Sequence, residues 1–131
     1  MSRRIEVIVN PGSGQPKPVL HTLNSVFRPA NVAWNLSLTN ESGDAERFAR
    51  QAVENNVDAV AAFGGDGTVM EVARGVMGSQ VPMAILPGGT ANLMSVELGI
   101  PKDLAKAAEI IANPESAVIS SSSSWLFASS R

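Results

Sequence analysis

Residues 63–71 read Phe-Gly-Gly-Asp-Gly-Thr-Val-Met-Glu, at the end of the largely apolar run 57–63 and directly before a stretch with helical spacing. Glycine has no Cβ, so three glycines allow positive φ angles and the close approach of a large anion. The helix that follows would offer unpaired N–H groups and the positive end of its dipole. A carboxylate at Asp66 would repel a phosphate unless a cation lay between them. The pattern predicts a nucleotide-phosphate loop, with a tight structural turn as the alternative.

Strands and helices are predicted to alternate along the chain. Strands are expected at 5–9, 32–38, 58–63 and 81–86, and helices at 18–27, 44–55, 68–77, 91–98 and 101–112. This alternation predicts an α/β fold, in which βα units build a three-layer structure around a parallel sheet. Such sheets bind ligands at the carboxyl ends of their strands. The loops expected there all carry glycine, and they are 10–14, 39–43, 64–67 and 87–90.

Composition narrows the class of protein. The chain has 131 residues, a hydrophobic fraction of 44%, a net charge of −2 and no cysteine. This balance is typical of a soluble globular domain and argues against a nucleic-acid partner, which basic residues would hold. The absence of cysteine excludes disulfides and thiolate metal sites. No apolar stretch approaches the length of a membrane span and no secretory signal precedes the first strand, so a cytoplasmic location is expected.

The C-terminal region has a different character. Residues 120–124 are five consecutive serines, and Trp125-Leu126-Phe127 follow without continuing any pattern. We therefore expect a domain at 1–119, incomplete at its C-terminal end, and a serine-rich tail at 120–131 that is disordered or abnormal. A docking peptide is the alternative for this tail.

Two common phosphate-binding motifs are absent after the first strand. No Gly-Lys-Ser/Thr occurs there, so the lysine of a P-loop kinase is missing. No Gly-x-Gly-x-x-Gly occurs there either, which weakens the assignment to a dinucleotide-binding Rossmann fold.

Four motifs in order resemble a known family. They are Asn10-Pro-Gly-Ser-Gly14, Thr39-x-x-x-Gly43-Asp44-Ala45, Gly64-Gly-Asp-Gly-Thr-Val-Met-Glu71 and Leu86-Pro-Gly-Gly-Thr-Ala-Asn92. Together, over residues 4–112, they are similar to the N-terminal catalytic domain of the diacylglycerol kinase family, which includes bacterial lipid kinases and sphingosine kinases. NAD kinases and phosphofructokinases are similar at the Gly-Gly-Asp-Gly turn, but the first and last motifs favour lipid kinases.

The resemblance implies an ATP-binding domain of a kinase that phosphorylates a diacylglycerol-like lipid hydroxyl, with Mg²⁺. An NAD-kinase-like enzyme and a non-catalytic nucleotide or partner module remain alternatives. Asp66 would act on Mg²⁺ directly or through water. The nucleotide-binding residues implied are Asn10, Ser13, Thr39, Gly64, Gly65, Asp66, Gly67, Thr68, Glu71, Gly89, Thr90 and Asn92.

Several of these residues have simpler structural interpretations. Thr39 and Thr90 are also suited to capping helix N-termini. Asn10 is a common turn former, and Glu71 fits a solvated helix face. The chain also departs from the family's pattern at Met70, where asparagine is often found, and at Leu93, where an acid is common.

The resemblance further implies a second, β-rich domain that supplies the catalytic carboxylate and part of the lipid cleft. Nothing after residue 113 resembles that domain. A kinase needs a base within reach of the acceptor hydroxyl, so the chain alone is expected to be inactive, with its catalytic residues unknown. Exposed apolar surface would then favour a homo-oligomer, and the full-length parent would contact a lipid substrate and the membrane periphery.

Overall fold

The computed structural model describes residues 3–13, 16–86, 108–109, 111–112 and 126–128; of residues 13, 16–19 and 126–128 it describes the backbone alone. Its sheet has the strand order β2-β1-β3-β4-β5. The strands are β1 (Arg4–Val9), β2 (Ala33–Leu38), β3 (Ala59–Phe63), β4 (Pro82–Ile85) and β5 (Leu126–Ala128). The first four are parallel, and β5 is antiparallel to β4.

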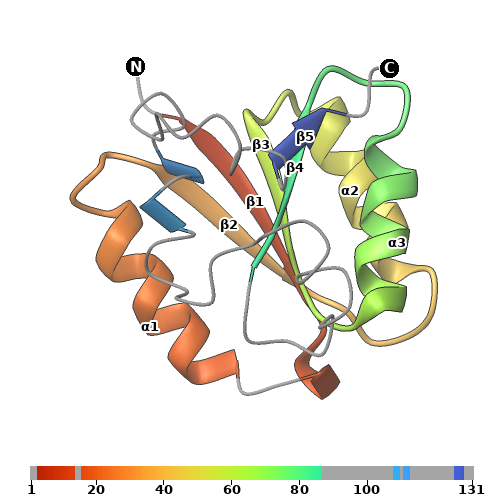
Figure 1. The fold of residues 1–131 in the computed structure, drawn as a ribbon, viewed down its shortest axis with the longest axis horizontal. Coiled ribbons are helices and arrows are strands. Elements are labelled where there is room, and N and C mark those ends of the chain that lie inside the picture. Colours follow the sequence, from red (N-terminus) through yellow and green to blue (C-terminus); the bar gives the residue numbers. More distant parts are fainter. Residues whose placement is uncertain (1–2, 14–15, 87–107, 110, 113–125, 129–131) are drawn as a thin grey trace.

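Helices cover both faces of this sheet. They are α1 (Pro16–Phe27), α2 (Asp44–Glu54) and α3 (Asp66–Val76), and a 3₁₀ turn, η1 (Pro11–Ser13), follows β1. Figure 1 shows α1 on one face and the neighbouring α2 and α3 on the other. The predicted three-layer α/β fold is therefore confirmed, and the strand bounds agree within one residue at each end. The helix predicted at 91–98 lies outside the described residues.

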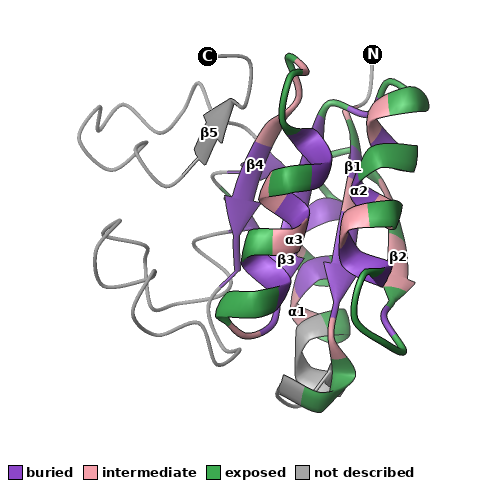
Figure 2. Ribbon diagram, turned by 90° about the vertical axis from the view of Figure 1, so that its right-hand side faces the viewer, coloured by how far each residue is buried: buried purple, intermediate pink, exposed green. Residues whose placement is uncertain are grey.

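The central strands form the core. Every residue of β3 is buried, as its unbroken apolar sequence predicts for a strand covered on both faces. Val7, Ile8 and Val9 of β1 are also fully buried, and the buried colour in Figure 2 is concentrated in these strands. In the region of the last predicted helix, Ala108 and Ile111 are helical and buried.

β2 is covered less completely than the central strands. Its alternate residues Trp34 and Leu36 are half-buried, and Leu38 is 48% exposed. The reason is that β2 is an edge strand with a neighbour on one side only. The ring of Trp34 packs edge-on against that of Phe27 of α1, and the ring centroids are 5.7 Å apart.

The tail differs in part from the expected disorder. Leu126–Ala128 form β5, whose Phe127 lies opposite Met83 of β4. This pairing occupies the backbone groups that β4 would otherwise leave open at the sheet edge. The other residues of 120–131 lie outside the described part of the chain, so the domain division at residue 119 stays a prediction.

The register brings three chain segments together. Val9 of β1 lies opposite Leu38 of β2 and Phe63 of β3. The pairing continues past the strands, because the N–H of Asn10 donates to the Phe63 carbonyl at 2.9 Å and the N–H of Thr39 donates to the Val9 carbonyl at 2.9 Å. The residues that follow these three strands therefore meet at one edge of the sheet.

Candidate functional site

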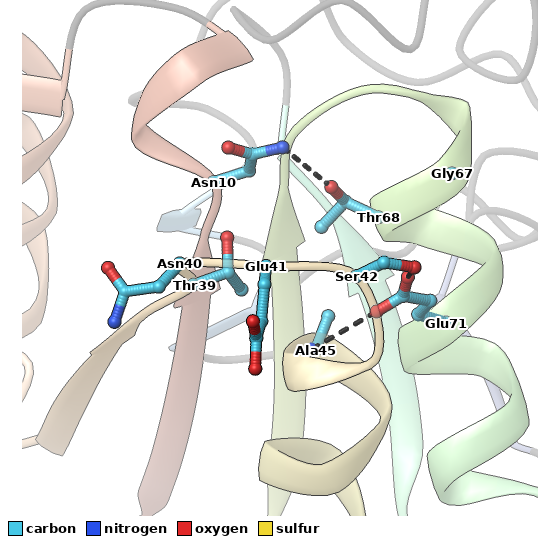
Figure 3. Close-up of a pocket in the computed structure, with 9 residues that line it drawn as sticks. All are labelled: Asn10, Thr39, Asn40, Glu41, Ser42, Ala45, Gly67, Thr68 and Glu71. Carbon is cyan, nitrogen blue, oxygen red and sulfur yellow. Dashed lines mark hydrogen bonds between the residues drawn. The ribbon is translucent and has the colours of Figure 1, made fainter.

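A cavity of about 320 Å³ lies at this edge, at the carboxyl ends of β1, β2 and β3. Its walls are the residue after β1, the loop between β2 and α2, the first turn of α2 and the first two turns of α3 (Figure 3). The lining residues are Asn10, Thr39, Asn40, Glu41, Ser42, Ala45, Gly67, Thr68 and Glu71. The cavity thus occupies the place where parallel α/β sheets bind ligands.

Asn10 ties the turn after β1 to α3. Its side-chain amide donates to the Thr68 hydroxyl at 3.3 Å, and its Oδ1 accepts the N–H of Gly12 at 3.0 Å. The second contact is the local turn expected of an asparagine after a strand. The first is a tertiary contact, so Asn10 does more than form a turn. It fixes one wall of the cavity against the other.

Close packing, and not a positive φ, requires glycine at position 64. A Cβ on Gly64 would lie 2.7 Å from the Thr68 Cβ and 2.8 Å from its hydroxyl oxygen. The expectation of positive φ angles in this turn is wrong, since the described glycines with positive φ are Gly43 and Gly78. The lack of a Cβ on Gly64 instead allows the Thr68 side chain, in the first turn of α3, to pack directly against the backbone at the end of β3.

The N-terminus of α3 carries no side-chain cap. Gly65 is its N-cap, with φ −79° and ψ −177°, and makes no side-chain capping hydrogen bond. The helix begins at Asp66, two residues before the predicted start, so Asp66 and Gly67 belong to the helix and not to the loop. An acid in the first turn interacts favourably with the helix dipole, and Asp66 is exposed there.

Two carboxylates bind the backbone of the β2–α2 loop. Asp44 accepts the N–H groups of Asn40 at 2.8 Å and Glu41 at 3.0 Å, and forms an ion pair with Arg47 at 3.0 Å. The amide of Asn40 and the Arg47 guanidinium, with the amide of Glu41, hold the pKa of Asp44 below its usual value of 3.8. Asp44 therefore remains ionised at neutral pH and holds the β2–α2 loop, through the N–H groups of Asn40 and Glu41, against the start of α2.

Glu71 is the second of these carboxylates, and it reaches the loop from α3. It accepts the N–H of Gly43 at 3.1 Å with each of its oxygens and the N–H of Ala45 at 3.2 Å. The hydroxyl of Ser42 donates to it at 3.4 Å. Glu71 is thus not the solvated helix-face residue of the alternative interpretation.

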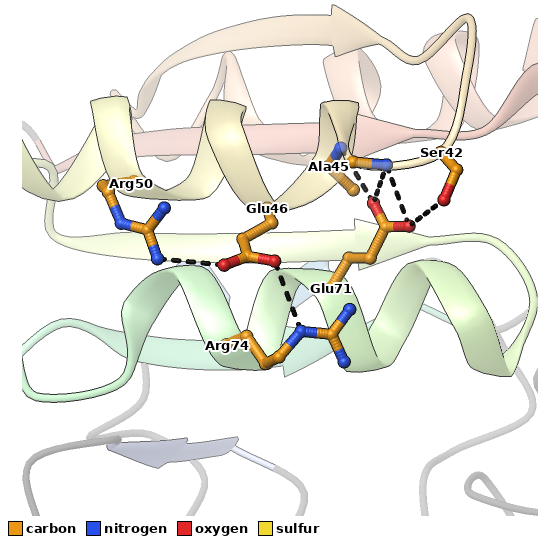
Figure 4. Close-up of polar contacts among 7 residues, drawn as sticks. Ser42, Ala45, Glu46, Arg50, Glu71 and Arg74 are labelled. Carbon is orange, nitrogen blue, oxygen red and sulfur yellow. Dashed lines mark hydrogen bonds and ion pairs between the residues drawn. The ribbon is translucent and has the colours of Figure 1, made fainter.

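A separate polar contact joins the same two helices further along (Figure 4). Glu46 of α2 accepts from Arg50 at 3.0 Å and from Arg74 of α3 at 3.2 Å. These two guanidinium groups, Arg50 first, lower the pKa of Glu46 from its usual value of 4.5. The helices α2 and α3 are therefore joined at the cavity end by Glu71 and one turn later by Glu46.

The cavity wall is rich in oxygen atoms. Its lining residues include two hydroxyl-bearing threonines, a serine and the carboxylates of Glu41 and Glu71, but no lysine or arginine. In the described part of the chain, no three His, Cys, Asp or Glu residues are placed to hold a metal ion. A polyanion bound here would need a cation to compensate its charge.

Comparison with known proteins identifies the family. The family model of the diacylglycerol kinase catalytic domain matches residues 4–123. The chain belongs to this family. The match extends beyond the range 4–112 that the motifs indicate.

Proteins similar to this chain include a probable lipid kinase YegS-like from Klebsiella pneumoniae (strain 342), 41% identical over 101 residues. A diacylglycerol kinase from Bacillus subtilis (strain 168) is 34% identical over 116 residues. These matches cover 76% and 85% of this chain, but 34% and 38% of the relatives. The chain therefore spans little more than a third of their length.

A solved structure shares the fold. The crystal structure of a diacylglycerol kinase from Bacillus anthracis str. Sterne superimposes with a TM-score of 0.73 at 33% identity. The superposition covers 86% of this chain and 40% of that one. The α/β arrangement around the cavity is thus the family's fold.

The structure assembles part of the predicted site. Of the twelve predicted nucleotide-binding residues, five line the cavity: Asn10, Thr39, Gly67, Thr68 and Glu71. Gly64, Gly65 and Asp66 lie beside it, where β3 passes into α3. The side chain of Ser13 and the residues Gly89, Thr90 and Asn92 lie outside the described part. Thr39 does not cap α2, because the N-cap is Gly43.

Sequence reasoning missed other lining residues. Asn40, Glu41 and Ser42 are the unspecified positions between Thr39 and Gly43 in the second motif, and Ala45 is the last residue of that motif. The signal was available, because a loop at the carboxyl end of a parallel strand lines the ligand site with its whole length.

Proposed function

We propose that this cavity binds ATP with Mg²⁺ and that the chain is the nucleotide-binding part of a lipid kinase. That enzyme would transfer the γ-phosphate of ATP to the hydroxyl of a diacylglycerol-like lipid. The observation that carries the proposal is the convergence of Asn10, Thr39 and Thr68 on one cavity in a chain of the diacylglycerol kinase catalytic domain family. The family match favours this function over the NAD-kinase alternative.

The two helix N-termini beside the cavity suggest where the phosphates bind. The first N–H groups of α2 already bond Glu71. The N-terminus of α3 has no side-chain cap, and such a terminus attracts anions through its N–H groups and its dipole. We therefore place the phosphates at α3, next to Gly67 and Thr68, and the remainder of the nucleotide along the wall from Thr39 to Ser42.

Charge supports the requirement for Mg²⁺. The described lining residues carry two carboxylates and no cationic side chain. Magnesium binds few protein ligands and keeps phosphate oxygens and water in its coordination shell. The exposed carboxylate of Asp66 is suited to hold such an ion through water. Phosphoryl transfer depends on this kind of positioning and charge compensation more than on a covalent nucleophile.

The proposal covers the phosphoryl donor. A base must also lie within hydrogen-bond reach of the acceptor hydroxyl, and we assign none of the described residues to that role. Because the chain matches little more than a third of its relatives, the lipid cleft and any contact with the membrane periphery rest on the family relation. Among the described residues, no helix is long and apolar enough to cross a membrane.

Calorimetry with Mg·ATP tests the proposal. Thr39→Val keeps the shape of a buried side chain and removes its hydroxyl, so we expect an affinity loss of about fivefold, as for one net hydrogen bond of ~1 kcal/mol. Asp66→Asn should reduce the gain in affinity that Mg²⁺ provides. Gln51→Ala, exposed on α2 beside a different cavity, is the control and should bind as the unmutated chain does. Equal binding by all four proteins would refute the assignment.

A further inference from the structure

Helix α2 has an unusual N-terminus. Its N-cap, Gly43, has a φ of +94° and no side chain with which to cap the helix. The first N–H groups of a helix have no partner within the helix. Ser, Thr, Asp or Asn at the N-cap commonly accepts a hydrogen bond from one of them. The sequence of α2 itself therefore leaves the N–H groups of Gly43 and Ala45 without such a cap.

Glu71 supplies the missing cap from another helix. Both of its oxygens lie 3.1 Å from the Gly43 nitrogen, and one lies 3.2 Å from the Ala45 nitrogen. Figure 4 shows the carboxylate reaching from α3 to the first turn of α2. A negative charge at this position also interacts favourably with the dipole of α2.

The cap connects two walls of the cavity. Thr68 and Glu71 are three residues apart on α3, so they lie on the same side of that helix. Thr39 is held at the other end of the loop, where its N–H bonds the Val9 carbonyl. With Asp44 bonding Asn40 and Glu41, the loop is fixed at both ends. Between these ends, Glu71 ties Gly43 and Ala45 to α3 on the side that carries Thr68.

We propose that Glu71 is a positioning residue for the nucleotide. Its carboxylate caps α2 in place of a residue of α2 and holds the wall formed by Thr39–Ser42 at a set distance from Thr68. Nucleotide affinity depends on Glu71 through the loop, without contact between Glu71 and the nucleotide. The inference rests on the proposed nucleotide site, but the cap itself can be measured without any nucleotide.

Amide hydrogen exchange in the 131-residue chain, without ligand, tests the cap. Loss of a helix N-cap costs about 1 kcal/mol, so Glu71→Ala should speed exchange at Gly43 and Ala45 by about fivefold. Glu71→Gln keeps an acceptor oxygen and should give a smaller increase. Glu46→Gln removes another carboxylate between the same helices but touches neither amide, so exchange should not change. Unchanged exchange in Glu71→Ala would overturn the proposal.

A double-mutant cycle on Mg·ATP affinity tests the positioning role. We expect Glu71→Ala to weaken binding about fivefold, on the scale of a lost cap, and Glu71→Gln to restore part of the loss. In a Thr39→Val background the effect of Glu71→Ala should largely disappear, because both changes disable the same wall. Fully additive losses would show that Glu71 acts independently of this wall and would overturn the inference. No binding by the unmutated chain would refute the nucleotide site itself, while the exchange result would still report on the cap.

Discussion

The contact between α2 and α3 depends on a glycine at position 75, and Gly75→Ala tests how tightly the two helices are packed. Gly75 is buried in α3. A Cβ at this position would lie 2.5 Å from the Cβ of Ala49 and 2.6 Å from the carbonyl oxygen of Glu46, both on α2. A backbone carbonyl cannot rotate away as a side chain can, so one helix must move.

The expected magnitude is the balance of two effects. In an exposed helix interior, replacing glycine by alanine stabilises by about 1 kcal/mol, because alanine has the higher helix propensity. Overpacking a tight interface costs about 1–3 kcal/mol. Two contacts shorter than 3.0 Å, one of them to backbone, place this site toward the upper end of that range. We therefore expect a net loss of ~1–2 kcal/mol in the free energy of unfolding.

Urea denaturation followed by far-UV circular dichroism measures this loss. Gly67→Ala is the matched control, since Gly67 lies in the same helix and a Cβ there would meet no atom within 4 Å. That variant should be as stable as the unmutated chain or slightly more stable. If Gly75→Ala were equal to Gly67→Ala in stability, the helices would have room for a methyl group and the argument for close packing would be wrong.

Two further predictions concern the turn after β3 and the β2–α2 loop. Gly64→Ala should lower the free energy of unfolding by about 1–3 kcal/mol, as overpacking does, because the new methyl group would lie 2.7–2.9 Å from atoms of the Thr68 side chain. Chemical denaturation measures this free energy, and an unchanged value would contradict the close approach. The pKa of Asp44 is lower in the folded chain than its usual 3.8, so the stability it contributes is present above that value and is lost as the pH falls through the folded pKa. Asp44→Asn should therefore destabilise the chain at pH 7. The difference in free energy of unfolding between this variant and the unmutated chain, measured by urea titration, should become smaller as the pH is lowered. A difference independent of pH would contradict the role of the charge.

The amino-acid sequence was sufficient for the architecture and for the edge of the sheet at which the cavity lies. The period of the apolar residues separates strands from helices, and alternation of the two requires a parallel sheet whose strands all end at one edge. Asn10, Thr39 and Thr68 could therefore be assigned to one site, although Asn10 and Thr68 are 58 residues apart. The edge position of β2 could not be predicted, because strand order does not follow from the local pattern, and this position leaves Leu38 48% exposed.

Within that architecture, the sequence by itself determined which residue types meet at the carboxyl ends of the strands. Only the tertiary structure decided what each of them does there. Gly64 is required because a Cβ at this position would collide with the Thr68 side chain, and Gly75 because a Cβ there would collide with α2. Glu71 caps α2, a helix to which it does not belong. The physical reason is that periodicity and propensity act over a few residues. Contacts between α2 and α3, across 28 positions of sequence, exist only once the sheet has placed the two helices side by side.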